Sequence, residues 1–242
     1  MVKSTSENAP KKTITKANRK PDRRKRRSTR PGCVVPAAAS AGSGLQPWAM
    51  ILIGFMGAGK SSVGRIMAGE LGWDFEDLDQ RIERQEERTV AEIFRDSGET
   101  EFRRLELEAL KEVLSSGAAG SGQILALGGG AFVQPQNASL IAAAGIPTIF
   151  LDAPVEELWQ RCRKQSAQQE TERPLLGELE SFRDLYQSRR PHYMQAAFRQ
   201  ETGGKSVELI AAEVIQAFGL KPSRQKRSTT KGSKTRSKQR SK

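Results

Sequence analysis

A glycine-rich segment that links a short apolar run to a helical pattern restricts the fold of this chain more than any other feature. The run is Met50–Ile53, and the segment after it, Gly54–Ser61, matches G-x-x-x-x-G-K-[ST] at every fixed position. Apolar residues then recur at helical spacing as far as Leu71. Glycines let backbone N–H groups converge on phosphate oxygens, and a helix start adds partial positive charge. We predict a loop that binds a nucleoside triphosphate; the alternative is a turn that only packs a helix on a sheet.

Apolar runs of strand length alternate with helical patterns through the rest of the body. Strands are expected at 50–53, 73–77, 124–127, 148–151 and 198–202, and the last of these is the weakest because 199–201 are poor strand formers. Helices are expected between them, including one opened by a Thr89–Glu92 capping box, a longer one through 105–114, and others at about 154–165, 178–196 and 206–218. Apolar strands without alternation predict a parallel sheet covered on both faces, an α/β fold.

The basic residues of the chain are concentrated at its two ends. The formal net charge is +12, yet residues 1–49 hold 12 Lys/Arg against two acidic residues, and residues 221–242 hold ten against none. The body, 50–220, holds 18 basic and 26 acidic residues. We therefore predict one globular domain at 50–220 between two disordered basic extensions. Such extensions can contact nucleic-acid phosphates without sequence preference.

The composition also bears on where the protein works. Two cysteines, Cys33 and Cys162, exclude a disulfide framework and suit a reducing compartment. Apolar stretches long enough for a membrane span or a secretory signal are not found in the sequence. We expect a cytoplasmic monomer that does not bind membranes. Because the N-terminus is rich in arginine and serine and poor in acids, a plastid transit peptide is the alternative.

The phosphate loop brings candidate ligands for the nucleotide. Lys60 is expected to reach the β- and γ-phosphates, the Ser61 hydroxyl to coordinate Mg²⁺, and Ser62 to help hold the α-phosphate side. Asp77 and Asp79 follow the second strand, and in an extended segment residues two apart project to the same side. Asp77 would then face metal-bound water and Asp79 an acceptor hydroxyl, as its anchor or base. The alternative is a helix start that Asp79 caps.

Arginines and glycines suggest how an anionic acceptor is held. Arg103 on a predicted helix and Arg189 near the end of another could each grip a carboxylate bidentately. The alternative, which the residues alone favour, is that such arginines are solvated or paired with nearby glutamates.

Gly128–Gly130 ends the third strand, at the sheet edge where ligands bind in open α/β folds; a flexible turn is the alternative. Arg173, in a polar loop, could neutralise transition-state charge, and Arg161 could stack on adenine; solvated arginines are the alternative.

Taken together, these segments resemble the shikimate kinase family over about residues 50–220. The ordered series that carries the resemblance is GFMGAGKSSVGR, F-x-D-x-D, EIF…GE..FRR.E, LGGG, RPLL and RRPHY. The resemblance implies a P-loop nucleoside-monophosphate-kinase-like three-layer sandwich, whose five-stranded parallel sheet has the order 2-3-1-4-5. It also implies transfer of the γ-phosphate of ATP to the 3-hydroxyl of shikimate, in aromatic amino acid biosynthesis through chorismate.

The resemblance also implies a role for each matching residue. ATP-binding roles fall on Gly57, Ala58, Gly59, Lys60, Ser61, Ser62, Arg161 and Arg173. Shikimate-binding roles fall on Asp79, Arg103, Gly129 and Arg189, with Arg103 preferred over Arg104 and Arg189 over Arg190. Ser61 resembles the Mg²⁺ ligand and Asp77 a carboxylate that reaches the metal through water. Lys60, Asp79 and Arg173 resemble the catalytic residues.

Two features depart from the family pattern. The basic extensions lie outside it, and the polar fifth strand leaves the adenine contacts near 203–206 open. Another small-molecule P-loop kinase, specific for gluconate or a nucleotide, is the alternative enzyme. A nucleic-acid-associated protein is the alternative outside that class.

Overall fold

The computed structural model describes residues 47–116, 122–169 and 178–223. Nearly all of the two predicted basic extensions, and Arg173 in the segment 170–177, therefore lie outside the described residues. The first strand already begins at Ala49, and Ser223 still donates a backbone hydrogen bond to the carbonyl of Glu70. The described residues thus include a few on either side of the predicted domain, 50–220.

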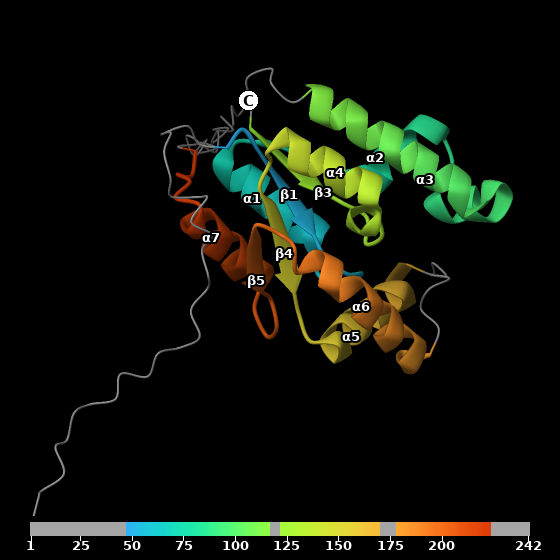
Figure 1. The fold of residues 1–242 in the computed structure, drawn as a ribbon. Helices are drawn as coiled ribbons and strands as arrows, with labels where there is room; N and C mark the ends of the chain where they lie inside the picture. Colours follow the sequence, from blue (N-terminus) through green and yellow to red (C-terminus); the bar gives the residue numbers. More distant parts are fainter. Residues whose placement is uncertain (1–46, 117–121, 170–177, 224–242) are drawn as a thin grey trace, which may run out of the picture. The chain divides into compact units, whose positions relative to one another are not determined.

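Five parallel strands form one sheet in the order β2-β3-β1-β4-β5, as predicted (Figure 1). The strands are β1 (Ala49–Ile53), β2 (Asp74–Asp77), β3 (Gln123–Ala126), β4 (Thr148–Asp152) and β5 (Phe198–Glu201). All five residues of the central strand β1 are buried, because helices cover both of its faces. This explains why β1 is apolar without alternation.

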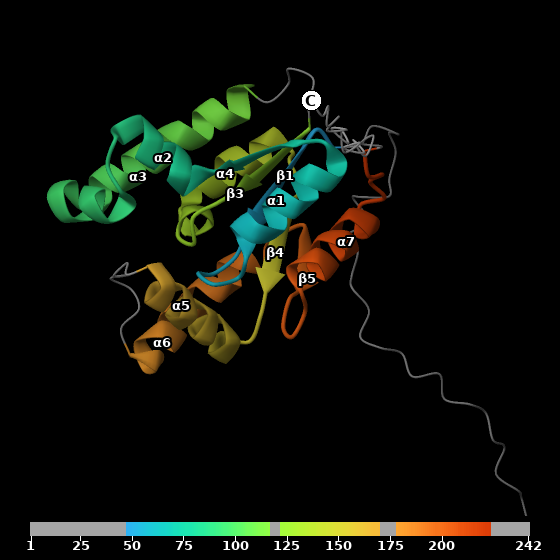
Figure 2. The same ribbon diagram turned by 180° about the vertical axis from the view of Figure 1, so that it is seen from behind.

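Helices cover both faces of the sheet. They are α1 (Lys60–Leu71), α2 (Leu78–Glu86), α3 (Val90–Ser116), α4 (Pro135–Ala144), α5 (Val155–Gln169), α6 (Leu179–Tyr193) and α7 (Val207–Ala217), with a 3₁₀ turn at Ala131–Val133. Helices α1 and α7 pack together on one face, while α4 and α6 lie over the other, as the two opposite views show (Figures 1 and 2). Among the described residues, no helix combines the length and apolar character that a membrane span requires.

The ends and packing of α1 follow from three glycines. Gly59 precedes its first residue with φ 87°, and Gly72 ends it in the left-handed conformation with φ 68°, as the sequence predicted. Gly64 faces β2, where a Cβ would lie 2.5 Å from Cε2 of Phe75. The helix therefore approaches the sheet so closely that only a hydrogen fits at this position.

The polar fifth strand forms as predicted, because it lies at the edge of the sheet. Phe198 and Gln200 are buried, while Arg199 and Glu201 are exposed. The buried amide Nε2 of Gln200 donates to Glu213 Oε2 at 2.6 Å and to the Glu201 carbonyl at 2.9 Å. An edge strand whose residues alternate between buried and exposed can carry charged residues on its exposed side, whereas a central strand covered on both faces cannot.

The Thr89–Glu92 capping box is confirmed by reciprocal hydrogen bonds. The backbone N–H of Thr89 donates to Glu92 Oε2 at 2.7 Å, and that of Glu92 donates to Thr89 Oγ1 at 3.2 Å. The helix that it opens and the longer helix through 105–114 are joined as α3, across a kink at Gly98 with φ 79°. The backbone of Gly98 is not helical, and a glycine with positive φ lets the chain turn between the two helical segments that the sequence predicted.

Candidate active site at the carboxyl edge of the sheet

The phosphate loop leaves β1 and closes around the side chain of Lys60. The Lys60 ammonium group donates to the carbonyls of Gly54 at 3.0 Å and Phe55 at 3.1 Å. Gly57 has φ 78°, and a Cβ there would lie 2.7 Å from the carbonyl oxygen of Leu158. The loop is thus packed tightly against α5, and its lysine charge is held at the start of α1.

The start of α1 suits an anion. Gly59 precedes Lys60 and contributes no side chain to cap the helix, and the first turn carries no acidic residue. Unpaired N–H groups and the helix dipole at such a start favour negatively charged oxygens. Ala58 is buried and donates its N–H to the Phe55 carbonyl at 3.2 Å, whereas Ser62 is exposed. The predicted cradle therefore has the local geometry of a phosphate site.

The two aspartates after β2 differ from the extended pair that the sequence predicted. Asp77 ends β2 and caps α2, because its Oδ1 accepts from the N–H groups of Asp79 at 3.2 Å and Gln80 at 3.4 Å. The prediction of an extended segment through Asp79 was therefore wrong, and so was the alternative that Asp79 is the cap. Asp79 is the second residue of the helix. The other oxygen of Asp77, Oδ2, accepts from the Ser61 hydroxyl at 2.5 Å, which joins the pair to the phosphate loop.

Asp79 points to the turn after β3. A Cβ on Gly128 would lie 2.5 Å from Asp79 Oδ1, and among the described residues this buried oxygen finds no hydrogen-bond partner. The pKa of Asp79 is raised to about 7, mainly by burial and then by the negative charges of Asp77 and Glu106, whereas Lys60 acts to lower it. A buried carboxylate oxygen without a donor is costly, so the site favours a ligand that brings a hydroxyl.

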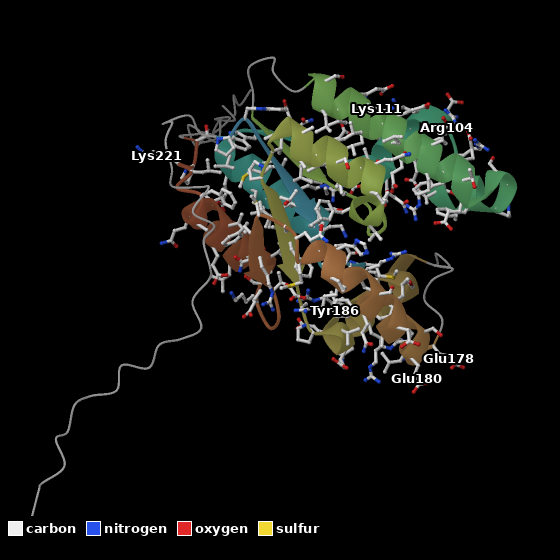
Figure 3. All side chains as sticks on the ribbon, in the orientation of Figure 1. Arg104, Lys111, Glu178, Glu180, Tyr186 and Lys221 are labelled. Carbon is white, nitrogen blue, oxygen red and sulfur yellow. The ribbon has the colours of Figure 1, made fainter. Side chains whose placement is uncertain are left out.

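Arg103 lies beside the same turn. Its Nη1 donates to both carboxylate oxygens of Glu106 at 3.1 and 3.0 Å, and its Nε donates to Glu99 at 3.2 Å. A Cβ on Gly130 would lie 2.7 Å from Arg103 Nη2. The alternative pairing with glutamates is therefore real, yet it places the guanidinium against the turn. Arg104 instead pairs with Glu101 and Glu108 on the exposed side of α3 (Figure 3).

Arg189 on α6 approaches the middle glycine. A Cβ on Gly129 would lie 3.7 Å from Arg189 Nη1 and 3.6 Å from the Met56 nitrogen of the phosphate loop. The Arg189 guanidinium lies 5.8 Å from the Phe55 ring centre. The neighbouring Arg190 binds elsewhere, donating to Asp152 Oδ2 at 3.0 Å. Gly128, Gly129 and Gly130 thus face Asp79, Arg189 and Arg103 in turn, beside the phosphate loop.

Arg161 lies on the other side of the phosphate loop. Its guanidinium donates to the carbonyls of Gly57 at 3.5 Å and Thr202 at 3.2 Å, and it pairs with Glu157. Glu157 in turn accepts from the Gly204 N–H at 3.2 Å. The segment after β5 is thereby fixed next to the phosphate loop, on the side where the sequence predicted adenine. Arg173 lies outside the described residues, so its role stays a prediction.

Sequence reasoning missed two residues that support the site. Tyr193 on α6 donates its hydroxyl to the carbonyl of Gly129, and Asn137 on α4 donates to Glu106 and Ala131. No helix range was predicted for 135–144, so no local pattern pointed to Asn137. Among the described residues, no cluster of three or more His, Cys, Asp or Glu side chains is suited to hold a metal.

Comparison with known proteins identifies the family. The family model for shikimate kinase matches residues 56–218. The shikimate kinase of Symbiobacterium thermophilum is 40% identical over 171 residues, which cover 69% of this chain and 94% of that protein. The shikimate kinase of Cereibacter sphaeroides is 38% identical over 176 residues, which cover 72% of this chain and 83% of that protein. A solved structure, shikimate kinase from Acinetobacter baumannii in complex with shikimate, matches with a TM-score of 0.63 and 34% identity over 74% of this chain and 95% of that one.

The sheet order and its flanking helices also agree with the P-loop nucleoside-monophosphate-kinase-like fold that the sequence predicted. Sequence, fold and site geometry thus lead to one assignment: the chain belongs to the shikimate kinase family.

Proposed function

We propose that the residues around the glycine turn and the phosphate loop perform the ATP-dependent phosphorylation of shikimate for this member of the family. The observation that supports this most strongly is the turn itself. Its three glycines face a carboxylate, Asp79, and two guanidinium groups, those of Arg189 and Arg103, directly beside the phosphate loop. A ring that carries hydroxyls and a carboxylate complements this set, with the carboxylate on the arginines and a hydroxyl on Asp79.

The nucleotide occupies the other half of the site. The N–H groups of Gly57–Gly59 and the first turn of α1, with Ser61 and Ser62, hold the phosphates, and the Lys60 ammonium moves from loop carbonyls to the β- and γ-phosphate oxygens. Arg161 lies along the adenine side. The family resemblance assigns Arg173, which lies outside the described residues, to the γ-phosphate. Three cationic side chains at the nucleotide end and two at the acceptor end hold the substrates in line.

The pair Ser61–Asp77 fits a magnesium ion. A hydroxyl and a carboxylate oxygen 2.5 Å apart are hard donors of the kind that Mg²⁺ takes, and phosphate oxygens and water complete such sites. Ser61 would bind the ion directly and Asp77 through water. When bound, the ion neutralises charge on the phosphates.

Transfer then depends on the acceptor hydroxyl. The oxygen of the shikimate 3-hydroxyl attacks the γ-phosphorus, the bond from that phosphorus to the β,γ-bridging oxygen breaks, and ADP leaves. Asp79 Oδ1, which is buried beside Gly128, accepts the hydrogen bond of the hydroxyl and takes its proton. Positioning and charge neutralisation supply most of the rate, so a strong base is not required.

The arginine pair on α3 provides a matched test of the acceptor end. Arg103→Lys should raise the KM for shikimate about tenfold or more, because a lysine cannot grip a carboxylate bidentately. ADP release by the full chain is measured with shikimate, gluconate and nucleotides as acceptors. Arg104→Lys, one residue away on the exposed side, should leave the shikimate KM unchanged.

Two outcomes would contradict the assignment. If gluconate or a nucleotide is phosphorylated faster than shikimate, the chain is a different small-molecule kinase. If Arg104→Lys raises the shikimate KM as much as Arg103→Lys does, the weaker binding reflects a general effect of changing α3 and not a specific contact of Arg103.

The basic extensions join the domain at the edge opposite the site. The Trp48 carbonyl accepts from Gln123 N–H at the start of β3, and the Ser223 N–H donates to Glu70 near the end of α1, whereas the site lies at the carboxyl ends of the strands. We propose that the extensions bind nucleic-acid phosphates independently of catalysis. We also propose a cytoplasmic location, which suits the buried Cys162 thiol, and a monomer, because this chain itself contains every residue to which the family resemblance gives a role.

Removing both extensions, 1–46 and 224–242, tests the nucleic-acid proposal. The shortened chain should keep the turnover of the full chain and lose its retention on immobilised double-stranded DNA at low salt. Because the contact is electrostatic, the retention of the full chain should weaken steeply as salt is raised. A full chain that passes through the DNA column at low salt would refute this use of the extensions.

A further inference from the structure

Asn137 lies behind the arginine that faces Gly130. We infer that Asn137 is a positioning residue for the acceptor: its amide fixes Glu106, and Glu106 in turn holds the Arg103 guanidinium against the glycine turn. This inference rests on the proposed function, because it assigns the effect of Asn137 to the binding of shikimate. Asn137 itself does not need to touch the substrate.

A single amide group joins two parts of the site. Asn137 is 2% exposed, and its Nδ2 donates to Glu106 Oε2 at 3.3 Å and to the carbonyl of Ala131 at 3.1 Å. Ala131 directly follows Gly130, so the second bond fixes the end of the glycine turn. The first bond fixes a carboxylate on α3. Asn137 therefore sets the distance between the turn and the arginine that faces it.

Glu106 needs this donor because it is buried. It is 1% exposed, and its two oxygens accept from Arg103 Nη1 at 3.1 and 3.0 Å. A buried carboxylate is costly unless donors satisfy its oxygens, and one nitrogen shared between both oxygens does not fill them. Without the amide of Asn137, Glu106 loses a donor on Oε2 and gains freedom to rotate, and Arg103 moves with it.

The charges around Glu106 agree with this role. Burial raises the pKa of Glu106, while Arg103, the Asn137 hydrogen bond and the Arg189 charge each lower it. Asp79 on α2 faces the same region, and the charge of Glu106 raises the pKa of Asp79. Removing the Asn137 donor thus raises the pKa of Glu106 further. The ionised carboxylate of Glu106 holds Arg103. When the pH is lowered, the contact between Glu106 and Arg103 should therefore be lost at a higher pH in a variant without the Asn137 donor than in wild type.

The chain offers a matched control in Gln200. Its buried amide also donates to one carboxylate, Glu213 Oε2 at 2.6 Å, and to one carbonyl, that of Glu201 at 2.9 Å. Gln200 is 3% exposed and lies in β5, next to the segment that approaches the adenine side. The two amides share burial and bonding pattern, and differ in which substrate lies nearby.

The experiment compares Asn137→Leu with Gln200→Leu in the full chain, with steady-state kinetics for both substrates. Asn137→Leu should raise the KM for shikimate about tenfold, as expected for a lost hydrogen bond to a charged group, with kcat and the KM for ATP unchanged. Gln200→Leu should leave the shikimate KM unchanged. In Asn137→Leu the rise of the shikimate KM on acidification should begin at a higher pH than in wild type.

Asn137→Asp serves as a second variant, since it keeps size and polarity if the leucine variant does not fold. It removes the donor and adds a negative charge beside Glu106, so the shikimate KM should rise at least as much. An unchanged shikimate KM in a folded variant, or an equal rise in both KM values, would overturn the inference. If wild type rejects shikimate, the proposed function fails; if Arg103→Lys raises the shikimate KM and the Asn137 variants do not, only this inference fails.

Discussion

Asp79→Asn should lower kcat by about 10³-fold while the protein stays folded. The amide keeps the shape of the side chain but cannot take the proton of the acceptor hydroxyl, and its NH₂ group presents a donor where an acceptor is required. The substitution also removes a buried negative charge close to Asp77 and Glu106. We therefore expect a melting temperature equal to or above that of wild type, which calorimetry measures alongside ADP release.

Asp96→Asn is the matched control for this variant. Asp96 is an exposed carboxylate on α3 that pairs with Arg95, and its replacement should change neither kcat nor KM. Near-normal turnover by Asp79→Asn would remove Asp79 from the proton transfer. A lower melting temperature with the same loss of turnover would instead indicate that the carboxylate stabilises the fold and that inactivity is secondary.

The phosphate loop could be predicted because its signal is local, whereas the order of the sheet came from the family resemblance. A continuous apolar run such as β1, followed by glycines and a lysine at fixed spacing, has few structural solutions. Even the polar strand β5 was found, since it follows a helix pattern and precedes another. The residues of β5 alternate between buried and exposed because the strand lies at the edge of the sheet. Such a strand can form without the continuous apolar run of a central strand.

The site itself was only partly predictable from the residues. Choosing Arg103 over Arg104 rested on the family resemblance, because both carry nearby glutamates at helical spacing. Burial separates them: Glu106, one partner of Arg103, is buried, whereas the partners of Arg104 are 37% and 51% exposed. Burial depends on tertiary packing, so spacing in one helix could not reveal it.

The aspartate pair shows a second limit. D-x-D is compatible with an extended strand or with a helix start, and the deciding factor is where β2 ends. The Asp77 side chain accepts the first N–H groups of α2 and the Ser61 hydroxyl together, which stops the strand at that residue. The bond to Ser61 joins residues 16 positions apart, so a local pattern does not contain it.

Lys60→Met should reduce kcat by about 10³-fold even at saturating ATP, a loss as large as that expected for Asp79→Asn. Methionine keeps the apolar stem but removes the ammonium group that donates to the carbonyls of Gly54 and Phe55 and, with ATP bound, to its phosphates. The same charge also lowers the pKa of Asp79, so its loss leaves less of this carboxyl ionised to take the proton. Lys111→Met, at an exposed position on α3, is the control and should retain full activity (Figure 3). If Lys60→Met loses affinity for ATP but turns over normally once saturated, the lysine only binds the nucleotide, and the stabilisation of the transferring phosphoryl group must come from other residues.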